Sequence, residues 1–202
     1  MGPVWAYRGN NMKKQITTKN IVTTGLLLAL EVILQVMGNY LQFGQVNINV
    51  SLLAVVMAAV LCGPLSGGIV GFFNGIMALV SPSTAFFMSI SPIGTFVTCL
   101  LKCTLAGVVA GLLYSLISKK NRFVGLIVAS LIVPIVNTGI FAICCFLFFR
   151  SFLQSGAEEA SSNMLAYLLI GVIGINFIVE VIATTILSTV TYPVIVKREK
   201  AA

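Results

Sequence analysis

The stretch from Ser91 to Leu116 is long enough to cross a lipid bilayer as one helix, and Lys102 is the single charged residue within it. A spanning helix needs about 20 predominantly apolar residues. A charged side chain near the bilayer centre costs roughly 2.5–3.5 kcal/mol on insertion scales. We therefore expect Lys102 to face a counter-ion, a ligand or a water-filled cavity inside the protein.

The composition extends this membrane character to the whole chain. Of the 202 residues, 58% are hydrophobic and only 8% are charged, whereas soluble domains carry about 25% charged residues. A chain of this length has room for roughly six spans. We predict an all-α integral membrane protein with six transmembrane helices and no soluble catalytic domain.

The basic residues are clustered, and their positions predict the orientation of the chain. One cluster precedes the first span, a second follows the fourth span, and a third ends the chain: Lys13, Lys14 and Lys19; Lys119, Lys120 and Arg122; and Lys197, Arg198 and Lys200. The positive-inside rule places such clusters in the cytoplasm. Both termini are therefore expected there, and the net charge of +7 is explained without a nucleic-acid partner.

The apolar runs predict six spans with approximate bounds 17–37, 50–62, 65–80, 92–118, 123–149 and 164–196. The polar segments 38–49, 81–92 and 150–163 are expected to be outer loops, and the first of them is a candidate to close over a ligand. Residues 1–11 are unlike the rest and are interpreted as a leader or an added segment. Residues 12–200 are expected to form a single six-helix domain.

The intramembrane polar residues fall near the middle or in the outer halves of the predicted spans, below the outer loops. Thr98 and Lys102 share one face of the fourth span, and Asn176 and Glu180 share one face of the last. This distribution predicts a polar cavity that opens outward and is closed inward. Its candidate substrate-binding residues are Lys102, Thr98, Asn137, Asn176, Glu180, Asn74, Asn47, Tyr40 and Glu31.

A closed network is the alternative, with Lys102 bonded to Glu31 or Glu180 and the asparagines bonded to neighbouring backbone, because polar residues also join membrane helices. Two carboxylates and one ammonium leave a formal charge of −1 if all are ionised, although burial can keep a carboxylate neutral. The sequence leaves open whether Lys102 meets a glutamate or a ligand carboxylate.

Enzymatic function has little support in the sequence. There is no histidine, and the five cysteines all lie in apolar runs, which favours small buried residues over metal ligands. The chain lacks the GxxxxGK[ST] phosphate-binding loop. We expect no catalytic residue, no metal and no cofactor. A small secondary carrier, or a membrane scaffold without ATPase partners, is the alternative from another functional class.

Three stretches resemble one known family of membrane proteins. They are LCGPLSGGIVGFFNG (61–75), SPIGTFVTCLLKCTLAGVVAGLLY (91–114) and VPIVNTGIF (133–141). With them, the chain from Met12 onward is similar to the substrate-binding S components of energy-coupling factor (ECF) vitamin transporters. The second and third stretches are similar to a subgroup assigned to pantothenate or to B6-type and pyrimidine-type precursors.

The resemblance implies a six-helix S-component bundle in the bacterial plasma membrane with a vitamin site in its outer half. It implies a transmembrane coupling subunit and two cytosolic ATPases as partners, and a subunit that topples in the membrane to release its substrate. The first helix of the family carries an AxxxA motif that packs on the coupling subunit. The matching positions here are Gly25 and Ala29, which keep a small surface.

The residue types of the polar set favour one vitamin over others. A lone cation with several amides and threonines suits a small flexible ligand that carries a carboxylate, and pantothenate fits that description. Few aromatic residues are expected near the polar set, which disfavours ligands that need stacking. A B6 vitamer or a pyrimidine precursor is the alternative, since Tyr40, Phe43, Phe86 and Phe87 in the outer loops are available to stack on a ring.

Overall fold

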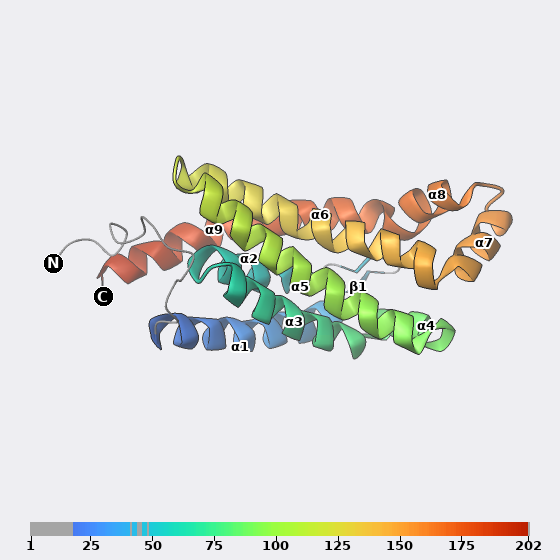
Figure 1. Cartoon of the computed structure of the whole chain (residues 1–202), viewed down its shortest axis with the longest axis horizontal. Helices are drawn as coiled ribbons and strands as arrows, with labels where there is room; N and C mark the ends of the chain where they lie inside the picture. The colour runs from blue at the N-terminus through green and yellow to red at the C-terminus, as the bar shows by residue number, and fades with distance from the viewer. Residues whose placement is uncertain (1–17, 41, 44–45, 48, 202) are drawn as a thin grey trace.

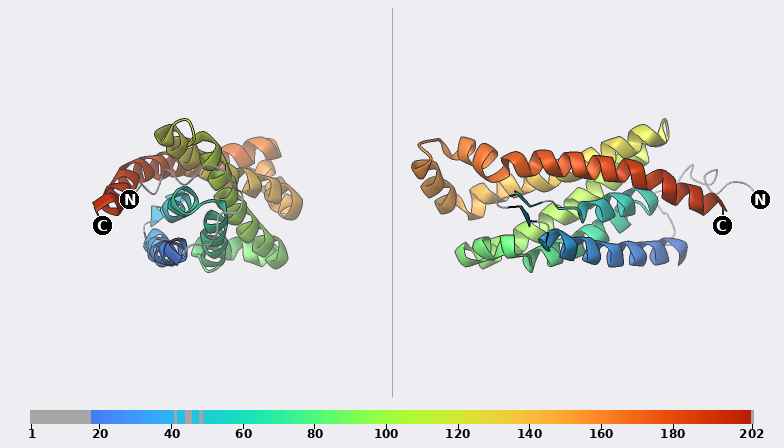
Figure 2. Two further views of the ribbon diagram at one scale, coloured as in Figure 1. Left: turned by 60° about the vertical axis from the view of Figure 1, so that its left-hand side comes forward. Right: turned by 180° about the vertical axis from the view of Figure 1, so that it is seen from behind.

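The protein is an elongated helical bundle in which most helices run along its length (Figure 1). The computed structural model describes residues 18–40, 42–43, 46–47 and 49–201, with side chains for 18–39 and 49–193. The predicted segment 1–11 lies outside the described residues. The start of α1, the α5–α6 connection and the end of α9 lie at one end of the bundle, and α4 and α7 lie at the other (Figure 2).

The first part of the chain contains a long helix, a small hairpin and a short helix. Helix α1 (Thr18–Tyr40) leads into the antiparallel strands β1 (Gln42–Phe43) and β2 (Val46–Asn47), in which Gln42 pairs with Asn47. Helix α2 (Leu52–Leu61) follows. The segment predicted as the first outer loop therefore begins as the end of helix α1 and continues as a pair of antiparallel strands of two residues each.

Helices α3 (Pro64–Leu79), α4 (Pro82–Ile90) and α5 (Pro92–Ile117) each have a proline in the first turn, where the missing N–H is not needed. A bend of 77° separates α3 from α4. Ser91 caps α5 by accepting a hydrogen bond from the Gly94 backbone N–H at 3.3 Å.

The last part of the chain contains helix α6 (Arg122–Phe148), which Asn121 caps by accepting from the Phe123 backbone N–H at 2.9 Å. Four elements follow it: α7 (Arg150–Glu159), α8 (Met164–Ala166), the π-helix η1 (Tyr167–Ile173) and α9 (Gly174–Ala201).

Four helical stretches in the described part of the chain are long and apolar enough to cross a membrane: Thr18–Asn39, Pro92–Ile117, Arg122–Phe148 and Met164–Pro193. A fifth is added if the bent pair of α3 and α4 is one span. Helix α2 has 10 residues, so it is about 15 Å long and half the thickness of the hydrocarbon core. The predicted count of six spans is thus one or two more than these lengths support.

Helix α2 forms the centre of the hydrophobic core. Its residues from Leu52 to Val60 are all buried within the protein, in the segment that the sequence predicted as the second span. Helices from both sides of the bundle surround it and contribute further buried side chains, among them Leu27, Val70, Ala106, Leu126 and Val133. The sequence of α2 is apolar at every position rather than on one face only, because protein covers the helix on all sides.

Glycines bring α3 and α5 into backbone contact. A Cβ built at Gly67 would lie 2.5 Å from the Gly107 carbonyl oxygen, and one at Gly75 would lie 2.6 Å from the Cys99 carbonyl oxygen. Gly71 is even closer to the Cys103 carbonyl. The small-residue stripe of α5 and the glycines of α3 therefore form one interface, as small residues commonly do between membrane helices.

Two predicted outer loops are helical. Residues 82–90 form α4, because Ser81 and Pro82 start a helix and the serines inside it do not interrupt one. Residues 150–159 form α7, which buries Leu153, Gly156 and Ala157 at positions i, i+3 and i+4. Both segments are polar enough to resemble loops. Helix α7 has an apolar face that the bundle covers, whereas α4 has no fully buried residue and packs through the half-buried Phe87.

Candidate functional site

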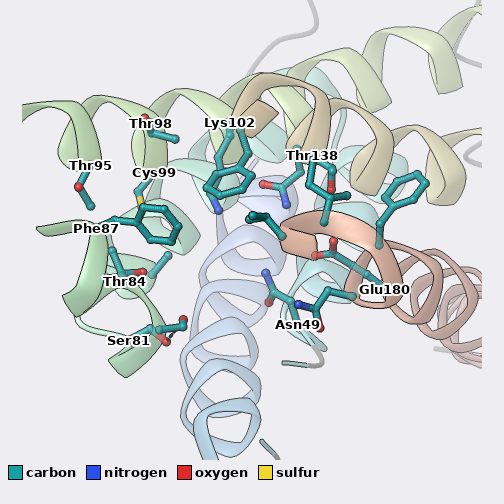
Figure 3. Close-up of a pocket in the computed structure, with 18 of the residues that line it drawn as sticks. Asn49, Ser81, Thr84, Phe87, Thr95, Thr98, Cys99, Lys102, Thr138 and Glu180 are labelled. Carbon is teal, nitrogen blue, oxygen red and sulfur yellow. Dashed lines mark hydrogen bonds between the residues drawn. The ribbon is translucent and has the colours of Figure 1, made fainter. Parts of the chain in front are cut away.

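A cavity of about 230 Å³ lies in the half of the bundle that contains α4 and α7 (Figure 3). Its walls come mainly from the start of α4, the first half of α5, the second half of α6, and η1 with the start of α9. Gln35 near the end of α1, Asn49 before α2 and Ala78 near the end of α3 complete them. The volume is just below the roughly 300–1,000 Å³ typical of pockets for drug-sized ligands. The cavity therefore suits a small ligand.

Helix α5 supplies the cationic wall. Thr95, Thr98 and Lys102 lie at positions i, i+3 and i+7, so all three face the cavity. Lys102 Nζ lies 5.3 Å from the centroid of the Phe141 ring on α6, within the range of a cation–π interaction. The aromatic ring thereby holds the ammonium group toward the cavity.

Helix α9 supplies an acidic and amide wall. Asn176 and Glu180 are one turn apart and both line the cavity. Glu180 is close enough to Lys102 to interact electrostatically, but no ion pair within 4.0 Å joins them among the described residues. Figure 3 shows the two side chains entering the cavity from different sides. The ammonium and the carboxylate are therefore placed to contact two different groups of one ligand.

Helix α6 supplies the wall between them. Asn137 and Thr138 line the cavity, and Asn137 Oδ1 accepts a hydrogen bond from the Cys103 thiol at 3.6 Å. This contact fixes the amide oxygen toward α5. The Nδ2 group of Asn137 then remains as a donor at the cavity wall.

Aromatic residues close the cavity, contrary to the prediction that few would lie near the polar set. Phe87, Phe141, Phe149 and Phe177 line it. The ring of Phe87 packs edge-on against Phe141 at 5.7 Å and Phe149 at 5.1 Å between centroids. The prediction was wrong because these rings come from α4, α6, the α6–α7 junction and α9 and converge only in the folded bundle.

The structure brings together five of the nine predicted site residues at the cavity wall: Lys102, Thr98, Asn137, Asn176 and Glu180. Glu31 and Asn74 lie behind the cavity, where Asn74 Nδ2 donates to Glu31 Oε1 at 3.1 Å. Tyr40 and Asn47 lie outside the described side chains. Of the two carboxylates considered as partners for Lys102, the one at the cavity is Glu180.

Several lining residues were absent from the predicted set. The sequence places Thr95 on the same helical face as Thr98 and Lys102, although Thr95 was not among the predicted binding residues. Gln35 lies four residues after Glu31, so helical periodicity could have identified it. Asn49, Ser81 and Thr84 lie in segments that sequence polarity marks only as loops. Their position depends on how the chain turns between helices.

The two predicted partner-docking residues lie on the opposite side of α1 from its buried residues. Gly25 and Ala29 are exposed, and a Cβ at Gly25 would meet no atom within 4 Å. Leu26 and Ile33 are exposed beside them. This face of α1 is smooth and apolar.

Among the described residues, no group of three or more His, Cys, Asp or Glu side chains is arranged to hold a metal ion. Comparison with curated proteins gave no match, and neither did comparison with solved structures. A family model for the substrate-specific component of ECF transporters matches residues 19–195, which is most of the chain. The chain therefore belongs to the substrate-specific components of ECF transporters, which are non-catalytic, multi-pass membrane subunits of a transport system.

Proposed function

We propose that this chain is the high-affinity substrate-binding subunit of an ECF importer for a small water-soluble vitamin. The observation that carries the proposal is the small cavity with a cation, a carboxylate and amides on its walls. Apolar and aromatic surface surrounds these few polar groups, which is the usual design of a small-molecule site.

The proposed orientation places both ends of the chain in the cytoplasm. Lys19 at the start of α1, Lys119 to Arg122 between α5 and α6, and the basic end of α9 lie at one end of the bundle. Arg150 begins α7 at the other end. With the positive-inside rule, this distribution supports an outward-facing cavity and a six-helix subunit in which α2 is buried within protein.

Pantothenate is the first candidate substrate. Its carboxylate would pair with Lys102, and its hydroxyl groups would donate to Glu180 on the facing wall. Charge-assisted hydrogen bonds of this kind are about twice as strong as neutral ones. The cavity therefore offers a partner for each polar group of a ligand with one anionic end.

A B6 vitamer is the second candidate, and the aromatic walls are the observation that favours it. Four phenylalanines line the cavity, and a planar ring gains from packing against their faces and edges. A pyrimidine precursor shares this property. Binding measurements with pantothenate and pyridoxine in parallel distinguish the two candidates.

We expect mass spectrometry to identify a small water-soluble vitamin among the molecules released when the purified subunit is denatured. A carboxylate-bearing compound without a ring would support pantothenate, and a pyridine or pyrimidine would support the second candidate. Release of only lipid, together with no binding of either probe, would contradict the proposed function.

The proposed partners are a transmembrane coupling subunit, which docks on the smooth face of α1, and two cytosolic ATPases. Co-purification of ATPases with the chain would support the importer. Uptake that proceeds without ATP hydrolysis would instead favour a secondary carrier, and a subunit that recruits no ATPase would favour a scaffold.

Replacing both Gly25 and Ala29 with leucine is expected to lower vitamin uptake by roughly ten-fold or more, since overpacking a tight interface costs about 1–3 kcal/mol. Ligand binding by the isolated subunit should not change, because both residues are exposed and distant from the cavity. Gly139→Leu on the exposed surface of α6 is the matched control. Equal uptake by the double variant and the control would contradict docking at this face.

A further inference from the structure

A cluster of five buried or half-buried polar residues lies behind the cavity, between α1, α2 and α3: Glu31, Gln35, Asn49, Ser51 and Asn74. Gln35 and Asn49 also line the cavity, whereas Glu31 and Asn74 do not. Ser51 joins the two halves of the cluster. Its Oγ contacts Gln35 Oε1 at 2.6 Å, Asn49 Oδ1 at 2.6 Å and the Nδ2 group of Asn74.

The hydrogen bonds of this cluster leave two acceptors unmatched. Asn74 uses one amide hydrogen for Glu31 Oε1 and the other for Ser51 Oγ. Glu31 Oε2 and Asn74 Oδ1 are both buried, and neither has a hydrogen-bond partner among the described residues. Both atoms are acceptors if Glu31 is ionised, so neither can satisfy the other.

The surroundings of Glu31 do not favour an ionised carboxylate. The side chain is 0% exposed, and none of the described lysines or arginines lies within 4.0 Å of its oxygens. Helices α2 and α3, which pack against α1, contain no titratable residue. A buried charge without a counter-ion is strongly unfavourable.

A single proton on Glu31 Oε2 removes both mismatches. A neutral carboxyl group would donate to Asn74 Oδ1, and this bond together with the one from Asn74 Nδ2 to Glu31 Oε1 would close a ring between an acid and an amide. We infer that Glu31 is a neutral carboxyl group in such a pair with Asn74, and that the pair, acting through Ser51, positions Gln35 and Asn49 for ligand binding.

The effect on the cavity follows from which amide atoms Ser51 contacts. Ser51 has one hydroxyl hydrogen, which it donates to the oxygen of Gln35 or of Asn49 in turn, and the amide that receives it leaves its NH2 group as a donor at the cavity wall. Asn49 faces Lys102 across the cavity in Figure 3. These donors would bind carbonyl or hydroxyl oxygens of the substrate. This second part of the inference depends on the proposed function, whereas the protonation of Glu31 does not.

Infrared spectroscopy of the ligand-free protein in detergent at neutral pH tests the protonation. The difference spectrum between the wild type and Glu31→Gln should contain the C=O stretching band of a protonated carboxyl group. A difference spectrum with only the bands of an ionised carboxylate would overturn the inference. No substrate is needed, so this result is independent of the proposed function.

Thermal unfolding and pantothenate binding test the positioning. Glu31→Gln keeps one acceptor and one donor toward Asn74, so the midpoint temperature of its thermal unfolding should match that of the wild type. Glu31→Ala loses both groups and should lower this midpoint by roughly 3–10 °C. Pantothenate affinity should stay within about three-fold in Glu31→Gln and fall about ten-fold or more in Glu31→Ala and Ser51→Ala.

Three outcomes separate the two proposals. Equal loss of stability and affinity in Glu31→Gln and Glu31→Ala would overturn the acid–amide pair. Unchanged pantothenate affinity in Ser51→Ala would overturn the positioning role. A wild-type protein that does not bind pantothenate would contradict the proposed substrate, while the infrared and unfolding comparisons still decide the state of Glu31.

Discussion

Replacing Lys102 with alanine is expected to weaken pantothenate binding by about 30-fold or more, because truncating one partner of a buried charge pair costs about 2–5 kcal/mol. Lys102 is the cation among the described residues that line the cavity. Without it, a substrate carboxylate would enter an apolar and amide-lined space with no counter-charge while Glu180 remains on the facing wall. Isothermal titration calorimetry on the purified subunit measures the change.

Two further variants separate the effect of losing the Lys102 charge from any effect on the stability of the fold. Lys102→Met keeps an unbranched stem beside Phe141 and should lose affinity to a similar extent, although its core packing is retained. Lys119→Ala removes an exposed lysine at the opposite end of the bundle and should bind as the wild type does. Wild-type affinity in Lys102→Met would remove the ammonium group from the site.

Replacing Gly71 with alanine is expected to destabilise the folded bundle by about 1–3 kcal/mol or more, which is the usual effect of overpacking. The added methyl group would collide with the backbone carbonyl of Cys103, which is part of helix α5 and cannot rotate away as a side chain can. The thermal midpoint should fall by roughly 3–10 °C, as measured by thermal unfolding in detergent.

Gly139→Ala is the matched control for this prediction. A Cβ at Gly139 would meet no atom within 4 Å, and alanine favours an α-helix over glycine by up to about 1 kcal/mol. Its midpoint should therefore equal or slightly exceed that of the wild type. A Gly71→Ala protein as stable as Gly139→Ala would show that α3 and α5 are not held at backbone contact distance.

The apolar runs predicted the four long helices well, because lipid imposes one rule on every spanning segment. The predicted span 123–149 corresponds to Arg122–Phe148, and 92–118 corresponds to Pro92–Ile117. Sequence polarity was a poor guide at the ends of the bundle. Helices α4 and α7 carry enough polar residues to resemble loops, and the packing of Phe87 on α4 and of the apolar face of α7 becomes evident only in the folded bundle.

The candidate site was predictable where its residues repeat along one helix. Thr98 with Lys102 on α5, and Asn176 with Glu180 on α9, share faces that helical geometry determines. The sequence did not indicate which helices face each other. For that reason Glu31 and Asn74 were grouped with the site although they lie behind it. Phe87 was considered only as a stacking residue of an outer loop, and Phe141, Phe149 and Phe177 were left out.

The π-helix η1 ends at Gly174, which has φ of 3° and ψ of −106° and whose backbone N–H donates to the Leu169 carbonyl. Val172 and Ile173 line the cavity before this point, and Asn176 and Glu180 line it after. A π turn contains an additional residue relative to an α turn. The wider winding of η1 therefore brings Val172 and Ile173 to the cavity wall, and the regular winding of α9 then brings Asn176 and Glu180 to it one turn apart. The apolar part and the polar part of this wall are thus set by two different helical windings of one continuous segment.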